Sequence, residues 1–143
     1  MISIQKQDVD IAGLIERAKQ RGTGAVVVFD GIVRDDDITE MELEAYEDVA
    51  RKELERIVDE AMMRYHLLSV DVVHRIGRLK VGDNILVIVV GAGHRKEAYD
   101  GSREILERIK EGVPIWKKEL RKEGDRWVPG EYPHGRGSDV HHR

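Results

Sequence analysis

The sequence of 143 residues contains no cysteine. This absence excludes disulfide bonds, thiolate metal sites, a cysteine nucleophile and any persulfide carried on this chain. Long hydrophobic runs are also absent, because no apolar stretch approaches the roughly 18 residues of a membrane span. Residues 1–4 lack the layout of a signal peptide. We therefore expect a cytoplasmic protein that does not enter a membrane.

Aromatic residues and net positive charge are scarce. Aromatic side chains make up 5% of the chain, and 28 acidic against 24 basic residues give a formal net charge of -4. This balance gives no overall attraction to nucleic acid, so any anion site must be local. An RNA-binding α+β domain can be drawn with Arg34 and Lys117 near strand ends, but few rings are available for stacking. We expect no nucleic-acid partner.

Motifs for metals and nucleotides are missing as well. The segment Gly91-Ala92-Gly93 lacks the further glycine and the acidic residue of a dinucleotide fingerprint, and no Walker-type phosphate loop is present. Five histidines show no pairing with carboxylates at metal-ligand spacing: His66, His74, His134, His141 and His142. We therefore predict no metal site and no bound cofactor.

The composition fits one folded domain, since hydrophobic residues make up 41% and charged residues 36% of the chain. Apolar spacing predicts strands at 2–4, 25–34, 41–45, 70–76, 85–90, 115–120 and 126–128, and helices at 11–18, 50–62 and 97–109. This order has too few regular β-α alternations for a doubly wound sheet and favours a mixed α+β fold. We expect the domain to span 1–128 and a loose C-terminal tail to span 129–143.

Local features can be predicted within these elements. The apolar run that begins at Ala25 is typical of a buried central strand, and Gly31 within it indicates a bulge or a close backbone approach. Asp48 is placed to cap the second helix. A turn around residues 82–84 predicts an antiparallel hairpin of the strands 70–76 and 85–90, and Gly124-Asp125 predicts a second, charged hairpin.

Basic residues stand where predicted strands or helices end, and such places commonly hold ligands. Arg34 closes the apolar strand, where it can pair with the following aspartates on the surface or bind a phosphate or carboxylate with its planar donor fork. His94-Arg95 follows a strand and two glycines at the start of a helix. This turn can be an ordinary cap or an anion site built from free N–H groups and the helix dipole.

Three lysines follow the same logic. Lys110 can simply complement the negative end of its helix, and Lys117 with Lys118 can serve as the charges of a protected edge strand. Alternatively, a partly buried lysine with a lowered pKa can exchange protons or attack a carbonyl near neutral pH. Trp116 nearby can wall a flat heterocycle or pack in the core.

Five segments, taken in chain order, resemble the large subunit of molybdopterin synthase. They are Phe29-Asp30-Gly31-Ile32-Val33-Arg34, His74-Arg75-Ile76-Gly77, His94-Arg95, the stretch with Lys110 and Pro114-Ile115-Trp116-Lys117-Lys118-Glu119, and Gly124-Asp125-Arg126-Trp127-Val128. The proline-to-glutamate segment is the most specific, and the five together span nearly the whole chain.

The resemblance implies an α/β hammerhead fold with a mixed sheet and an additional small antiparallel hairpin region. It also implies a homodimer with one small ubiquitin-like subunit at each end, which makes a heterotetramer. In this family the small subunit's C-terminal glycine thiocarboxylate supplies two sulfurs to cyclic pyranopterin monophosphate, giving molybdopterin. The chain would then be a sulfurtransferase of molybdenum cofactor biosynthesis, and residues 1–128 its single catalytic domain.

Residue roles are implied in the same way. Lys110 and Lys117 resemble the family's two active-site lysines. Other positions resemble its residues for the substrate, the phosphate and the lining of the pocket: Ile32, Val33, Arg34, His94, Arg95, Lys118 and Glu119. In this family a basic residue after the segment matching Val128 can reach the neighbouring protomer's site, whereas here Pro129-Gly130-Glu131 follows and Arg136 lies further on. The alternative function is a non-catalytic module that binds and senses a phosphorylated metabolite.

Overall fold

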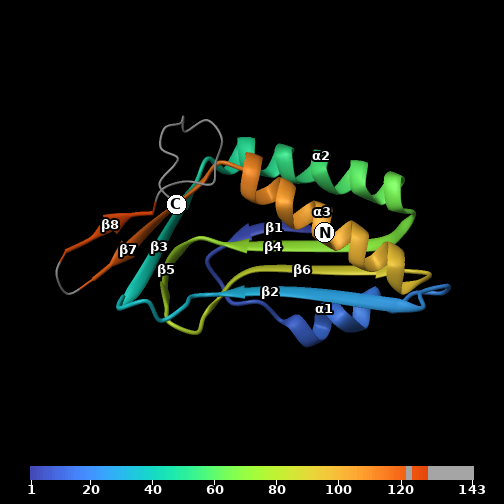
Figure 1. Ribbon diagram of the computed structural model, residues 1–143, viewed down its shortest axis with the longest axis horizontal. Helices are drawn as coiled ribbons and strands as arrows, with labels where there is room; N and C mark the ends of the chain where they lie inside the picture. Colours follow the sequence, from blue (N-terminus) through green and yellow to red (C-terminus); the bar gives the residue numbers. More distant parts are fainter. Residues whose placement is uncertain (122–123, 129–143) are drawn as a thin grey trace.

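The computed structural model describes residues 1–121 and 124–128, which form two four-stranded sheets and three helices (Figure 1). The strands are β1 (Ile2–Gln5), β2 (Ala25–Ile32), β3 (Glu40–Ala45), β4 (Leu67–Arg75), β5 (Gly77–Lys80), β6 (Asn84–Ala92), β7 (Ile115–Leu120) and β8 (Arg126–Trp127). The helices are α1 (Ile11–Ala18), α2 (Glu47–Tyr65) and α3 (Arg95–Gly112). This mixed arrangement confirms the predicted α+β class.

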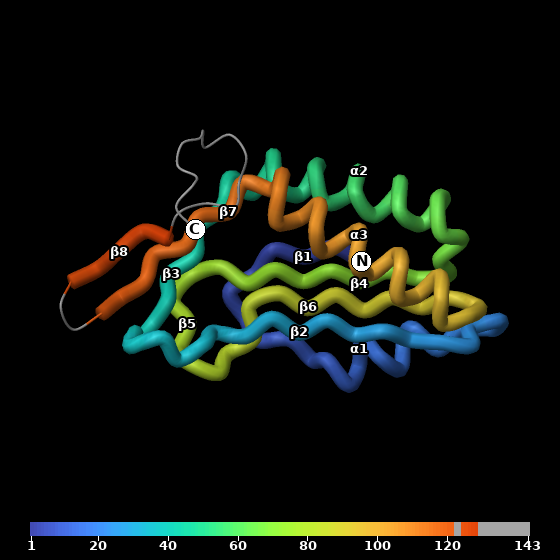
Figure 2. Tube along the Cα trace, viewed as in Figure 1, coloured from blue at the N-terminus to red at the C-terminus, as the bar shows by residue number. Residues whose placement is uncertain are grey.

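The first sheet has the strand order β1-β4-β6-β2, with β1 parallel to β4 and the other neighbours antiparallel. Helices α2 and α3 pack on one face and α1 packs on the other, so the sheet is the middle layer (Figure 2). Strand β6 is therefore covered on both sides, and every residue from Ile85 to Ala92 is buried. Its unbroken apolar run is what such a position requires.

The core divides between the two faces of this sheet. Alternate residues of β6 point to opposite sides, so Ile88 and Val90 join the core beneath α2 and α3, whereas Val87 and Val89 pack against Leu14 of α1. Each fully buried side chain of this size contributes about 1.5–3 kcal/mol. Burial on both faces fixes the register of β6, because a slip by one residue would exchange the two sets.

The second sheet has the order β5-β3-β7-β8 and lies across one end of the first sheet (Figure 1). The predicted antiparallel pairing of β4 with β6 is confirmed, but their connection is not the expected simple turn. Gly77, at a φ of 90°, turns the chain out of the first sheet so that β5 can pair with β3. Residues 77–80 are too short and too charged to signal a strand in the sequence.

Two further predictions need correction. Strand β2 lies at the edge of the first sheet rather than in its centre, and Val28 and Ile32 are 37% and 51% exposed. A continuous apolar run can form an edge strand or a central strand, and only the pairing with neighbouring strands decides which of the two it forms. Helix α2 begins at Glu47 with Tyr46 at its N-cap, so Asp48 lies in the first turn and interacts with the helix dipole instead of capping it.

The bulge predicted at Gly31 is confirmed, because the pairing of β2 with β6 shifts register between Gly31 and Ile32. The charged hairpin is confirmed as well: β8 pairs antiparallel with β7, and the amide of Val128 donates to the carbonyl of Lys117 at 2.8 Å. The bulge in β2 and the β7–β8 hairpin both lie toward the end of the molecule where the two sheets join (Figure 1).

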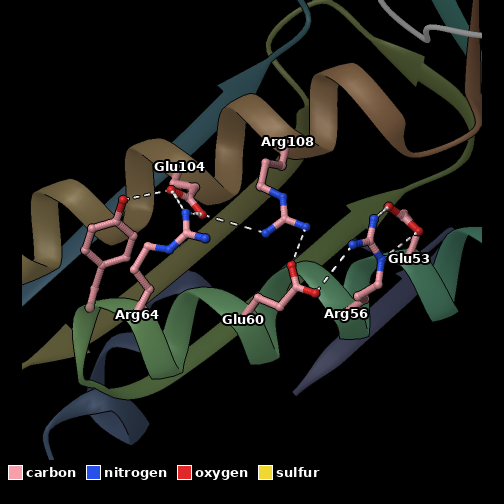
Figure 3. Close-up of polar contacts among 7 residues, drawn as sticks. Glu53, Arg56, Glu60, Arg64, Glu104 and Arg108 are labelled. Atoms are coloured by element: carbon pink, nitrogen blue, oxygen red, sulfur yellow. Dashed lines mark hydrogen bonds and ion pairs between the residues drawn. The ribbon is translucent and has the colours of Figure 1, made fainter.

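Ion pairs connect α2 to α3 along their exposed sides (Figure 3). Arg108 donates to Glu60 at 2.7 Å, and Arg64 donates to Glu104 at 2.9 Å. The hydroxyl of Tyr65 also donates to Glu104, at 2.7 Å, and this bond raises the pKa of Tyr65 above its ordinary value. The network links the helix that carries Lys110 to the helix beside it.

Among the described residues no helix is long and apolar enough to cross a membrane. The predicted tail at 129–143, including His134, Arg136, His141 and His142, lies outside the residues that the structure describes.

Candidate active site

A cavity of about 940 Å³ opens where the two sheets meet. It is bounded by the end of β2, the turn between β5 and β6, the last turn of α3, and strand β7. Most of its wall is apolar, including Val33, Met41, Ile85 and Ile109. Its size and lining are typical of a site for a small organic molecule.

The bulge in β2 brings three predicted residues to this cavity, since Ile32, Val33 and Arg34 all line it. Val33 is held by two backbone hydrogen bonds, from its amide to the Asp83 carbonyl and from the Gly82 amide to its own carbonyl, each 2.9 Å long. Val33 is buried, whereas the Arg34 side chain is 84% exposed at the rim and pairs with Asp36 at 2.9 Å. Arg34 thus makes the surface ion pair and also borders the cavity.

Both predicted lysines line the same cavity. Lys110 comes from the last turn of α3, and Lys117 from β7, where it stands opposite Leu43 of β3. Two cationic groups from separate elements therefore face one apolar space. Such a place can hold an anionic group and move protons to and from it.

Glu119 also lines the cavity, on the same side of β7 as Lys117. Its buried carboxylate accepts hydrogen bonds from Arg121 at 2.5 Å and Arg126 at 2.8 Å. Burial by itself raises the pKa of Glu119, but these two hydrogen bonds prevail and hold that pKa below its ordinary value. The charge of Glu119 is therefore used to fasten β8 to β7.

Lys118 does not line the cavity. Strand alternation turns it away from Lys117, and its ammonium lies 3.8 Å from a carboxylate oxygen of Asp125 and 5.5 Å from the ring centre of Trp127. Trp116, by contrast, borders the cavity and meets the Tyr46 ring edge to face at 5.5 Å.

His94 and Arg95 lie at the other end of α3 from Lys110. Lys110 follows Arg95 fifteen positions later in the helix, which corresponds to about 22 Å along the helix axis. Both are exposed, and the His94 side chain makes no capping hydrogen bond. A single chain therefore brings Arg34, Lys110 and Lys117 together and leaves His94 and Arg95 apart.

The structure adds one residue to which the sequence assigned no role. His74 lines the cavity and is only 5% exposed. Burial, with the nearby ammonium groups of Lys117 and Lys110, lowers the pKa of His74 from 6.5 to about 4, against the opposing effect of its hydrogen bond to the Arg75 carbonyl. Two signals were available in the sequence: its place in the resembling segment His74-Arg75-Ile76-Gly77 and its position on the same face of β4 as Val70 and Val72.

Nothing in residues 1–121 and 124–128 gathers three or more histidines or carboxylates as a metal site would. The chemistry available to the cavity is that of lysine, arginine, imidazole and carboxylate groups beside apolar walls.

Comparison with known proteins identifies the relatives of this chain. The family model described as MoaE protein matches residues 4–112. The chain belongs to the MoaE family. Among curated relatives, the molybdopterin synthase catalytic subunit of Pyrococcus abyssi is 38% identical over 129 residues, which cover 87% of each chain. The subunit of the same name from Ralstonia nicotianae is 41% identical over 133 residues, covering 89% of this chain and 76% of that protein.

Solved structures agree with the MoaE assignment. Molybdopterin synthase from Staphylococcus aureus matches with a TM-score of 0.83 and 38% identity, covering 87% of this chain and 94% of that one. A complex of subunits 1 and 2 of the molybdopterin-converting factor from Helicobacter pylori matches with a TM-score of 0.77 and 25% identity, covering 89% of each chain. The resemblance stated from the sequence is confirmed, and the fold is consistent with the hammerhead description.

Proposed function

We propose that this chain is the catalytic subunit of a molybdopterin synthase. It would transfer two sulfurs from the thiocarboxylated C-terminus of a small ubiquitin-like subunit to cyclic pyranopterin monophosphate. The observation that carries the proposal is the cavity into which Lys110 and Lys117 both project from separate elements. Its family membership and the names of its relatives point to the same reaction. We place the reaction in the cytoplasm.

The sulfur must come from a donor outside this chain, because the chain has no cysteine to carry it. A two-subunit complex among the structural relatives supports a small partner. The cavity of about 940 Å³ has room for a bicyclic or tricyclic heterocycle beside the narrow end of an extended peptide. We infer that the partner's C-terminal tail enters there and places its thiocarboxylate beside the substrate.

The two lysines have complementary tasks in this proposal. An ammonium group pairs with the negative thiocarboxylate and holds its sulfur against the carbon that it attacks. The carbon–sulfur bond forms as a carbon–oxygen bond of the substrate breaks. Water then cleaves the acyl–sulfur bond, so the sulfur stays on the pterin, the tail leaves as a carboxylate, and a lysine supplies or accepts the protons that move. Lys117 comes from strand β7 and Lys110 from the last turn of α3, so the two ammonium groups reach the substrate from different elements.

The phosphate would be held by Arg34 together with His94 and Arg95 of a second copy of the chain. The outer edge of β2 is unpaired by any described strand, and exposed Val28 lies near its middle. Two copies pairing β2 antiparallel about a two-fold axis would place the beginning of one strand beside the end of the other. Arg34 follows the end of β2, and His94 follows Ala92, which pairs with Ala25 at its beginning.

The homodimer would thus complete two equivalent sites, and a small subunit at each would give the heterotetramer. Ile32 and Val33 would form the apolar wall next to the substrate. Glu119 and Lys118 would act mainly through the hairpin, since each is bonded to a residue of the segment that contains β8. These bonds would hold the part of β7 that directly follows Lys117.

The test is a turnover assay with the purified chain, the thiocarboxylated small subunit and cyclic pyranopterin monophosphate. The proposal predicts a product that carries the dithiolene, detected by mass. Tight binding of the pterin without any product would favour the alternative, a module that senses a phosphorylated metabolite.

A further inference from the structure

His74 is a buried residue that lines the cavity. It is the penultimate residue of β4, on the face that packs toward α2 and α3, and its neighbours across the sheet are Ile4 of β1 and Leu86 of β6. A polar ring that is 5% exposed is unusual in such an apolar setting, because its nitrogens have lost most of their contact with water.

The hydrogen bond of His74 defines which nitrogen carries the proton. Nδ1 lies 2.9 Å from the carbonyl oxygen of Arg75. A carbonyl oxygen can only accept, so Nδ1 must be the donor. In the neutral ring the second nitrogen, Nε2, is then an acceptor with its lone pair available.

Burial keeps the His74 ring neutral, and the positive charges around it act in the same direction. Lys117 of β7 and Lys110 of α3 both act on it, and Glu119 lines the same cavity but is bonded to Arg121 and Arg126. A proton on Nε2 would add a third positive charge beside two ammonium groups. His74 therefore presents a neutral acceptor to the cavity throughout the physiological pH range.

We propose that His74 is a substrate-binding residue whose Nε2 accepts a hydrogen bond from an N–H group of the heterocycle. The inference rests on the proposed function, since a pterin carries both N–H donors and acceptors on its rings. The groups of this cavity that we assign to the phosphate and thiocarboxylate are all donors: Arg34, Lys110 and Lys117. Of the described side chains that line the cavity, His74 is the neutral acceptor, and it complements the ring N–H as those groups complement the anions.

A matched pair of substitutions separates this role from a structural one. In His74→Gln, the amide oxygen can occupy the place of Nε2, so an acceptor remains. In His74→Asn, the shorter amide can keep the donor near Nδ1 and its bond to the Arg75 carbonyl, but the acceptor at Nε2 is lost. We expect His74→Asn to raise KM for the pterin at least about tenfold, because an N–H left without its partner is costly, and His74→Gln to raise it much less.

The opposite order, with His74→Asn near the wild-type KM and His74→Gln impaired, would assign His74 to the Arg75 bond alone and overturn the proposal. Equal, near-normal KM values for both variants would overturn it too. Thermal melting of both variants shows whether either is misfolded. If either is, the decision passes to a measurement on the wild-type chain.

That measurement uses nitrogen-15 labelled histidine and NMR. We expect a protonated Nδ1 and an unprotonated Nε2 in His74, and a shift of the Nε2 resonance when cyclic pyranopterin monophosphate is added without the small subunit. An Nε2 resonance unchanged by saturating substrate, in a chain that does turn over, overturns the role of His74 and leaves the proposed function standing. A shifted Nε2 resonance in a chain without turnover overturns the proposed function and leaves the binding role of His74 standing.

Discussion

Acidification should destabilise this protein through His74, and the magnitude follows from its burial. The pKa of His74 is lowered from 6.5 to about 4 in the folded chain. As the pH falls, the unfolded chain binds this proton first, so the stabilisation is complete above pH 6.5 and is lost progressively down to about 4. At 1.36 kcal/mol per pH unit, the loss is about 3 kcal/mol. That is a large part of a typical total stability of about 5–15 kcal/mol.

The assay is urea unfolding at several pH values between 7 and 4, on the wild-type chain and on His74→Gln. Carboxylates titrate in both proteins, so the difference between the two free energies of unfolding isolates His74. We expect this difference to change by about 3 kcal/mol across the range, in the direction that penalises the wild type at low pH. His66→Asn, at an exposed position after α2, serves as the control and should run parallel to the wild type. Parallel curves for wild type and His74→Gln would refute the reasoning.

Three further predictions test the assembly and the fold. Arg34→Ala and Arg95→Ala should each be nearly inactive. Mixing and reannealing the two variants should restore roughly a quarter of the wild-type activity, because half the dimers are mixed and one of the two sites in each mixed dimer is intact. No recovery would contradict a shared site. Gly24→Ala should lower the free energy of unfolding in urea by about 1–3 kcal/mol, because the new Cβ would collide with the Gly93 carbonyl. Gly112→Ala is the control and should not lower the free energy of unfolding, because a Cβ there meets only an ordinary contact. Glu60→Gln should lower the melting temperature more than Glu55→Gln does, because the Glu60 substitution breaks the ion pair with Arg108. The difference between the two melting temperatures should shrink in 1 M salt. A salt-independent difference would speak against an ionic origin.

Most elements could be predicted because their signals are local. Apolar periodicity located α1 and α3 nearly to their ends, and the glycine in the middle of an apolar run predicted the bulge at Gly31. The position of a strand within a sheet is not a local property. Strands β2 and β6 carry similar apolar runs, and only the pairing of β6 with both β2 and β4 makes it the buried one. Strand β5 escaped notice because four residues carry too little pattern.

The site was predictable in part for the same reason. Arg34, Lys110 and Lys117 each stand at or near the end of an element, and those ends meet where the two sheets join. The sequence placed His94 before the start and Lys110 at the end of one predicted helix, but it could not reveal which helix termini share a ligand. It also could not reveal the burial of His74, which depends on neighbours from β1, β6 and α3.

The central claim is that sulfur transfer takes place in the cavity that contains Lys110 and Lys117. Turnover of cyclic pyranopterin monophosphate by Lys117→Ala tests it most directly, with thiocarboxylated small subunit present and binding of that subunit measured in parallel. Lys52→Ala, an exposed lysine of α2 that does not line the cavity, is the matched control. We expect Lys117→Ala to bind the small subunit and lose at least about a hundredfold in rate, as general acid–base groups typically contribute, while Lys52→Ala keeps full activity. Full turnover by Lys117→Ala would contradict the account.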